Sequence, residues 1–217
     1  MKQYTGAIFD MDGVLFDTER LYQQTWAELA SERGIALGDD FMPTISGTNG
    51  EVMHQIVRRF YHVSDSAAVI NDCMARMRDK LTRDVPVKPG AREILAFFRE
   101  AGFRVAVASS SRRAQIENNL NLSGLAPFFD AVVSGEDVSA GKPDPAIFLR
   151  AAAAIQCPPE QCFVFEDSRN GVRAGHAAGC ATIMVPDLVA PSPDILPLCF
   201  RVFPNLLAAL DELRTYP

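Results

Sequence analysis

The chain alternates between two hydrophobic rhythms. Short apolar runs without a polar face predict strands that are buried on both sides; they span residues 7–9, 103–108, 131–133, 162–165, 181–185 and 202–203. Most of these runs are separated by segments whose apolar residues recur every three or four positions, which predicts amphipathic helices. Strands that alternate with helices in this way indicate a parallel sheet covered on both faces.

One long stretch follows only the helical rhythm. Residues 18–84 contain no strand-like run, and their apolar positions mark three helices: Leu21 to Ala30, then Val52, Ile56 and Phe60, then Val69, Cys73, Met77 and Leu81. The segment 43–50 predicts a loop between the first two helices. We therefore expect an α/β protein with a doubly wound, Rossmann-like parallel sheet, built from residues 1–17 and 85–217. An all-α helical cap, residues 18–84, is inserted into it.

Composition narrows the class of protein. Hydrophobic residues make up 48% of the 217 residues and the net charge is −6, which argues against a nucleic-acid-binding protein. No apolar run approaches the ~20 residues of a membrane span, and the first strand begins too early for a signal peptide. The five cysteines form no Cys-x-x-Cys pattern, and the three histidines lie far apart. We expect a cytoplasmic protein with reduced thiols and no zinc site.

The most informative stretch is the end of the first strand. Asp10 follows the apolar run directly, Asp12 comes two residues later, and Gly13 allows a sharp turn. Alternate side chains of an extended segment point the same way, so both carboxylates can face one site. Taken alone, the pattern is equally typical of an Asx-turn, and it also resembles part of a calcium loop.

Further strand ends carry chemically useful residues. Ser109 ends the second strand, Lys142 lies beyond the third, and the pair Glu166 and Asp167 closes the fourth. Singly, a serine is more often a helix cap, a lysine a solvated turn residue, and an acidic pair a capping group. Ligands of open α/β sheets bind outside the carboxyl ends of the strands, so all of these groups are predicted to meet at one site.

These groups suit phosphoryl transfer. An environment of carboxylate oxygens favours Mg²⁺, which neutralises an incoming phosphate. Asp10 can then attack phosphorus and form an aspartyl-phosphate, while Asp12 protonates the leaving oxygen and later deprotonates water. Ser109, neighbouring backbone N–H groups and the Lys142 ammonium would hold the phosphate oxygens.

Four ordered motifs resemble those of the haloacid dehalogenase-like hydrolase superfamily: Asp10-Met-Asp-Gly-Val14, Ser109, Lys142 within Gly-Lys-Pro-Asp-Pro, and Glu166-Asp167-Ser168 followed by Gly171. The helical insert resembles the first cap class of that superfamily, and the resemblance covers essentially the whole chain. It implies that Asp10 is the nucleophile and Asp12 the acid/base. It also implies phosphate binding by Ser109, Ser110 and Lys142, and a Mg²⁺ cofactor held by Asp10, the Asp12 carbonyl, Glu166 and Asp167.

The branch most similar to this chain contains β-phosphoglucomutases and small-metabolite phosphatases. True dehalogenases lack the second aspartate, so Asp12 argues against dehalogenation. The mutases carry an arginine in the first cap loop, whereas Ser46-Gly-Thr-Asn-Gly-Glu51 has none, and Tyr22 stands where they usually have a histidine. Asp17 to Tyr22 also resembles phosphatases of a pyrimidine-type nucleoside monophosphate. The expected specificity residues in the cap are Glu19, Tyr22, Gly47, Thr48 and Asn49.

The favoured hypothesis is a Mg²⁺-dependent phosphatase of a small phosphorylated metabolite, either a sugar phosphate or a nucleoside monophosphate. We expect a monomer without nucleic-acid or membrane partners. A hexose-phosphate mutase of the same fold is the alternative. A receiver domain, which also phosphorylates an aspartate, is a different class of protein. Receivers place that aspartate on a later strand and lack a helical insert, so the cap argues for an enzyme.

Overall fold

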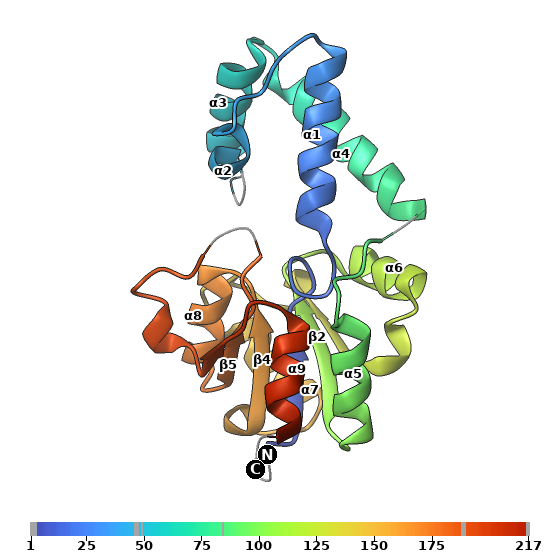
Figure 1. The fold of residues 1–217 in the computed structure, drawn as a ribbon, viewed down its shortest axis with the longest axis vertical. Helices are drawn as coiled ribbons and strands as arrows, with labels where there is room; N and C mark the ends of the chain where they lie inside the picture. The colour runs from blue at the N-terminus through green and yellow to red at the C-terminus, as the bar shows by residue number, and fades with distance from the viewer. Residues whose placement is uncertain (1–3, 46–47, 49, 84, 188–189, 216–217) are drawn as a thin grey trace. The chain divides into compact units, whose positions relative to one another are not determined.

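The computed structural model describes residues 4–45, 48, 50–83, 85–187 and 190–215. The chain folds into two compact units, one of residues 1–17 with 85–217 and one of residues 18–84. The first unit, here called the core, contains the described strands (Figure 1). The second unit, here called the cap, is built from helices.

The core is a parallel sheet with helices on both faces. Within the described residues the sheet has six strands in the order β3-β2-β1-β4-β5-β6. These are β1 Gly6–Phe9, β2 Arg104–Ser109, β3 Ala131–Ser134, β4 Cys162–Glu166, β5 Ala181–Met184 and β6 Arg201–Val202. The helices are α5 Ala91–Glu100, α6 Arg113–Ser123, α7 Ala146–Ala154, α8 Arg169–Ala177 and α9 Leu206–Thr215. Short 3-10 turns are η1 Ala126–Phe128, η2 Gly135–Asp137, η3 Pro159–Gln161 and η4 Leu196–Leu198. The predicted doubly wound parallel sheet is confirmed.

The two faces of the sheet are packed with different side chains. On the face covered by α5 and α9, the rings of Phe9 and Phe165 stack with centroids 4.4 Å apart, and Phe98 of α5 meets Phe9 edge-on at 5.9 Å. On the face covered by α7 and α8, the cluster around Ile8 is mostly small or aliphatic, with Ala106 and Val164 among its members and Phe148 as its aromatic residue. Because side chains alternate along a strand, each buried strand supplies both faces.

Two crossings connect the core to the inserted segment, and they are hydrogen-bonded to each other. The Asp17 N–H donates to the Pro86 carbonyl at 2.8 Å, and the Lys88 N–H donates to the Leu15 carbonyl at 2.8 Å. The Lys88 ammonium also pairs with Asp17 at 3.4 Å and with Asp187, which follows β5. Both crossings are therefore fixed by contacts within the core.

The cap consists of α1 Thr18–Glu32, α2 Phe41–Ile45, α3 Gly50–Tyr61 and α4 Ser66–Arg83 among the described residues. Its centre is aromatic. The fully buried Trp26 meets Phe41 and Tyr61 edge-on, each with ring centroids 5.7 Å away, and the Tyr61 hydroxyl donates to the Trp26 carbonyl at 2.6 Å. The helical periodicity of the sequence therefore corresponds to a small core of the cap's own.

The prediction of a loop over residues 43–50 was wrong at its start, because α2 covers Phe41–Ile45. Pro43 lies in the first turn of this helix, where the backbone N–H groups have no acceptor within the helix, so proline is tolerated there. Burial of Phe41 and Ile45 stabilises the short helix. The sequence did not indicate this helix, because the proline and glycines of this stretch are typical of a loop.

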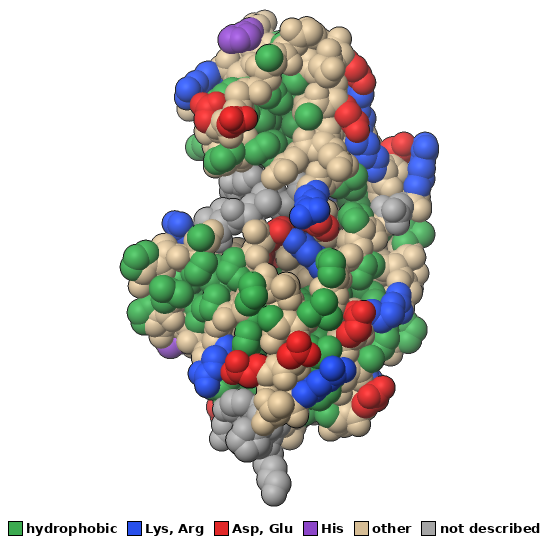
Figure 2. Space-filling model, viewed as in Figure 1, with side chains coloured by type: hydrophobic (Ala, Val, Ile, Leu, Met, Phe, Trp, Pro, Cys, Tyr) green, Lys and Arg blue, Asp and Glu red, His purple; other side chains and the backbone are tan. Residues whose placement is uncertain are grey.

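One face of the core is mixed in charge (Figure 2). Acidic and basic side chains lie interspersed over the face of the core shown in Figure 2. No helix in the described part of the chain is long and apolar enough to cross a membrane. The five cysteines are free thiols, and all except Cys199 are buried.

Candidate active site

Three neighbouring strands bring the predicted core residues to one edge of the sheet. Ser109 is the last residue of β2, Glu166 is the last residue of β4, and Asp10 follows β1, which lies between these two strands. The Asp10 N–H donates to the Phe165 carbonyl at 2.9 Å, which continues the ladder between β1 and β4 by one residue. The carboxyl edge therefore holds these groups side by side, as expected for an open parallel sheet.

Lys142 lies between two carboxylates of this edge. Its ammonium forms ion pairs with Asp10 and with Glu166, and it lies 5.0 Å from the centre of the Phe148 ring. The exposed fractions of the three side chains are 9% for Lys142, 9% for Asp10 and 0% for Glu166. Burying an ion costs free energy that must be offset by strong attraction to its partners. This buried cluster therefore differs from an ordinary ion pair on the surface.

The electrostatics of the cluster show an excess of negative groups. Burial raises the pKa of Asp10 to about 7, although Lys142 opposes the rise, and Glu166 adds to it. Burial also raises the pKa of Asp167 well above its usual range, with further contributions from Glu166 and Asp10. Burial alone would lower the pKa of Lys142, but Asp10 and Glu166 together hold that pKa above its usual value. One ammonium does not balance these carboxylates, so a further cation would be stabilised here.

Glu166 is fixed by donors from its own strand end. Its Oε2 accepts hydrogen bonds from the Asp167 N–H at 3.0 Å, the Ser168 N–H at 2.9 Å and the Ser168 hydroxyl at 3.0 Å. The Ser168 hydroxyl in turn accepts the Gly171 N–H at 3.0 Å and caps α8. A Cβ at position 171 would overlap the Glu166 carboxyl, so the spacing from Glu166 to Gly171 is a packing requirement.

Gly13 has a related role beside Asp167. Its φ of 81° lies in the left-handed region, and a Cβ at this position would overlap the Asp167 carboxyl. The Gly13 N–H donates to the Phe16 carbonyl at 2.9 Å, which closes the turn after Asp12. Glycine is therefore needed both for the conformation of the turn and for its close approach to Asp167.

The serine run after β2 connects to the second aspartate. The Ser111 N–H donates to the Ser109 Oγ at 3.1 Å, and the Ser111 hydroxyl donates to the Asp12 Oδ2 at 3.0 Å. Ser109 is 2% exposed, whereas Ser110 is an exposed residue. Ser111 was not among the residues predicted for the site. The signal in the sequence was the run of three serines, of which the family resemblance implied phosphate binding by Ser109 and Ser110.

The structure describes the side chains of only some of the five predicted specificity residues of the cap. The Tyr22 hydroxyl donates to the Met74 sulfur at 2.6 Å and the Thr48 hydroxyl donates to the Ile45 carbonyl at 2.7 Å, both within the cap. Gly47, Asn49 and the side chain of Glu19 lie outside the described residues. The predicted specificity of these five residues therefore stays a prediction.

A metal site must be judged from the donors present. Among the described residues, no three Asp, Glu, His or Cys side chains are placed to hold one metal ion together. Mg²⁺ usually keeps several water ligands and takes only one or two carboxylates from the protein. The predicted set is Asp10, the Asp12 backbone carbonyl, Glu166 and Asp167, and it is of this kind if Glu166 acts through a water. The unbalanced carboxylates described above fit such a cation.

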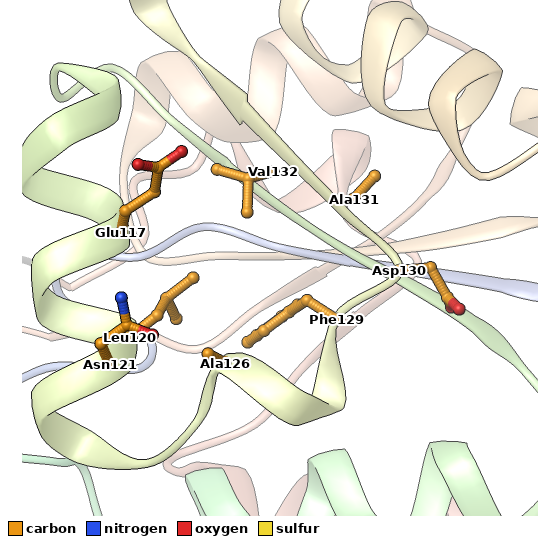
Figure 3. A pocket seen from close by; sticks show the side chains of 8 residues that line it. All are labelled: Glu117, Leu120, Asn121, Ala126, Phe129, Asp130, Ala131 and Val132. Carbon is orange, nitrogen blue, oxygen red and sulfur yellow. The ribbon is translucent and has the colours of Figure 1, made fainter.

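A separate hollow of about 160 Å³ lies between α6 and the edge strand β3. Figure 3 shows the side chains that line it, among them Glu117, Phe129 and Asp130. None of the predicted site residues belongs to its lining, and Asp130 precedes β3, at the opposite end of the strand from Ser134. This hollow is therefore not part of the candidate active site.

The fold is a doubly wound α/β fold in which buried, ion-paired side chains gather at the carboxyl edge of the sheet. The chain belongs to the haloacid dehalogenase-like hydrolase family, whose profile matches residues 7–185. The predicted family is thereby confirmed, and so is the predicted enzyme class, a phosphatase of this family.

Within this family, the chain is similar to several proteins that have been named for an activity. The chain is 33% identical over 180 residues to a phosphorylated carbohydrates phosphatase of Thermotoga maritima, which covers 81% of this chain and 82% of the relative. It is 31% identical over 188 residues to hexitol phosphatase B of Escherichia coli K12, covering 85% of each protein. The crystal structure of a candidate β-phosphoglucomutase from Thermotoga maritima is also similar. It has a TM-score of 0.84 and 27% identity, and the match covers 98% of this chain and 100% of that chain.

Proposed function

We propose that this protein is a Mg²⁺-dependent phosphatase that hydrolyses a small sugar phosphate or sugar-alcohol phosphate through an aspartyl-phosphate on Asp10. The observation that carries the proposal is the buried ion-paired cluster of Asp10, Lys142 and Glu166 at the carboxyl edge of the sheet. A structural role alone would not justify burying these ions, because an apolar replacement is often equally stable.

The reaction begins with attack of the Asp10 carboxylate on phosphorus. The bond from phosphorus to the leaving oxygen breaks with its electron pair, and Asp12 gives that oxygen a proton. Ser109, Ser110 and the Lys142 ammonium hold the phosphate oxygens, and Lys142 also keeps Asp10 in place through its ion pair. In the second half-reaction Asp12 takes a proton from water, which attacks phosphorus and restores the free Asp10 carboxylate.

Mg²⁺ would be held by the Asp10 carboxylate, the Asp12 backbone carbonyl and Asp167, with Glu166 contributing through a water. When bound, the cation supplies positive charge that lets two anions, the phosphate and Asp10, approach each other. Burial raises the pKa of Asp10 to about 7, and a cation bound beside Asp10 would favour the anion needed for attack. Both Glu166 oxygens already accept hydrogen bonds from protein donors, which supports an indirect role for this residue.

The two phosphatase relatives support the substrate class. One is named for phosphorylated carbohydrates and the other for hexitol phosphates. We therefore place sugar and sugar-alcohol phosphates ahead of the nucleoside monophosphates that the sequence also suggested. Recognition of the leaving group is assigned to the cap, where Glu19, Tyr22, Gly47, Thr48 and Asn49 are the proposed specificity residues.

The second candidate is a hexose-phosphate mutase, favoured by the structural similarity to the Thermotoga maritima protein named as a candidate β-phosphoglucomutase. A mutase must grip the second phosphate of a bisphosphate intermediate, and an arginine with its forked donors is well suited to that task. The first cap loop, residues 46–51, contains no arginine. This departure supports the phosphatase.

The decisive experiment compares the two reactions in one tube. Purified protein with Mg²⁺ is given β-glucose 1-phosphate and a catalytic amount of glucose 1,6-bisphosphate, and the products are followed by ³¹P NMR. We expect inorganic phosphate and no net glucose 6-phosphate. A parallel screen of hexose, hexitol and nucleoside monophosphates measures phosphate release. Accumulation of glucose 6-phosphate faster than phosphate would establish the mutase, and no release from any monophosphate would contradict the phosphatase.

A further inference from the structure

We propose that Ser111 is a positioning residue that fixes the Asp12 side chain for proton transfer to the leaving group. The inference rests on the proposed function and deepens it. The Ser111 hydroxyl donates to the Asp12 Oδ2 at 3.0 Å, and the two residues are 99 positions apart in the sequence. A contact between two separate strand-end loops at the acid/base residue itself points to a role in placing that carboxyl.

The backbone of Ser111 is anchored on both sides. Its N–H donates to the Ser109 Oγ at 3.1 Å, and its carbonyl accepts the Gly135 N–H at 3.3 Å. A Cβ at position 135 would lie 2.6 Å from the Ser110 carbonyl oxygen, so glycine is needed for this close approach. The backbone of Ser111 is therefore held by the end of β2 and by the turn after β3. This fixes the position from which the Ser111 side chain reaches Asp12.

The usual role of a serine at this place does not account for the contact. Serine near the start of a helix commonly caps it by accepting a backbone N–H. Here the helix is α6, which begins at Arg113, and the residue at its N-cap is Arg112, without a side-chain cap hydrogen bond. The Ser111 hydroxyl instead donates to Asp12. The hydrogen bond to Asp12 therefore explains why a hydroxyl stands at this position.

The hydrogen bond fixes one of the two Asp12 oxygens, because Oδ2 accepts the Ser111 hydroxyl. In the first half-reaction the bond from the Asp12 carboxyl to its proton breaks and a bond from the proton to the leaving oxygen forms. In the second half-reaction water returns a proton to the Asp12 carboxylate. The Ser111 hydroxyl donates to Oδ2 throughout, so it holds one orientation of the side chain in both protonation states.

The test uses the dependence on the leaving group. The Ser111→Ala variant is compared with wild type on the best sugar phosphate, whose alkoxide needs a proton, and on p-nitrophenyl phosphate, whose phenolate does not. Loss of a hydrogen bond to a charged group corresponds to about 10- to 100-fold in rate. We expect a kcat decrease of this size on the sugar phosphate with an unchanged KM, and less than about twofold on p-nitrophenyl phosphate. The matched control is Ser123→Ala, whose hydroxyl donates to the Leu120 carbonyl at the other end of α6.

Two further variants test the role of Ser111 in addition to Ser111→Ala. Ser111→Cys retains the size of the side chain with a much weaker donor and should reproduce the loss even if the alanine variant folds poorly. In an Asp12→Ala background the change of Ser111 to Ala should have no further effect on the sugar phosphate, because the two residues act as one unit. An equal decrease on both substrates, or additive losses in the double variant, would overturn the proposal. Failure of the proposed function is a different result, in which wild type releases phosphate from neither substrate.

Discussion

The carboxyl edge of the core sheet and the surface of the cap place their charged side chains in opposite environments. In the core, Asp10, Lys142 and Glu166 form ion pairs in which no side chain is more than 9% exposed. In the cap, Arg76 pairs with Glu32 at 2.6 Å, and their side chains are 33% and 54% exposed. The same kinds of residue therefore form an enclosed cluster in one unit and solvated pairs in the other.

This difference indicates where chemistry can be inferred from charge. Removing an ion from water is costly, and its partner rarely repays the full amount, so a buried ion indicates a task beyond stability. An exposed ion pair contributes little and forms readily on any polar surface. The buried ion cluster of the core is therefore evidence for function, whereas the ion pairs of the cap are not.

The largest expected effect is that of Asp10→Asn. The amide preserves the shape of the side chain and cannot act as the nucleophile, so phosphate release should fall by at least about 10³-fold. The matched control is Asp72→Asn, the same chemical change in a half-buried pair of the cap. Circular dichroism checks that both variants fold. Activity of Asp10→Asn within tenfold of wild type in Mg²⁺-loaded protein would remove Asp10 from the mechanism.

The next largest effect concerns the metal. Asp167→Asn should raise the Mg²⁺ concentration for half-maximal rate at least about tenfold, because even indirect partners of a metal are typically worth 10- to 100-fold in affinity. Isothermal titration with Mg²⁺ should show the same loss without reference to activity. Asp194→Asn, at an exposed pair with Arg173 in the same unit, serves as control. Full activity after complete chelation, or an unchanged Mg²⁺ titration of the variant, would count against Asp167 as a ligand.

The comparison also explains which parts of the molecule could be predicted from the sequence. Buried parallel strands leave unbroken apolar runs, and the polar residues that end them stand out, so the sheet and the meeting of Asp10 with Glu166 were predictable. Ser111 was not, because its contact with Asp12 depends on the path of the turn after β2 and on Gly135 behind it.

The cap shows the opposite case. Its helices were predictable from their apolar stripes, but α2 was missed because Pro43 and the following glycines predict a loop. The contacts of individual polar side chains were not predictable, because a periodic pattern of apolar residues does not restrict them. Tyr22 of α1 and Thr48 illustrate this, since both hydroxyls have partners within the cap that the sequence did not indicate.

A smaller effect is expected at Asp130, next to the amino end of β3. Its carboxylate accepts the Val105 N–H at 2.8 Å and pairs with Arg99 at 2.7 Å and Arg104 at 3.1 Å. Burial opposes ionisation, but the Val105 N–H and the two guanidinium groups together lower the pKa of Asp130. An acid with a lowered pKa in the folded state stabilises the protein above its unfolded pKa, and that contribution is lost as the pH falls through the folded value.

Asp130→Asn should therefore lower the free energy of unfolding at pH 7 by about 0.5–1 kcal/mol, a value discounted for the solvent exposure of both arginines. Urea unfolding of wild type and variant at pH 7 and again below pH 3.8, the ordinary value for Asp, measures the difference. The difference should shrink at the lower pH. A difference that is constant or grows on acidification would show that packing, and not the charge, is responsible.

The smallest effect is expected for Arg76→Met in the cap. Arg76 connects α4 to α1 through Glu32 and also pairs with Asp72 one turn away at 2.9 Å. Methionine keeps most of the apolar stem and removes the charge, and the lost attraction is screened by water and salt. The shift in the urea midpoint should be smaller than that of Asp130→Asn and should vanish in 1 M salt, with phosphate release unchanged. A larger shift that persists in high salt would mean that the cap, like the core, depends on desolvated charge, and the contrast between the two units would then fail.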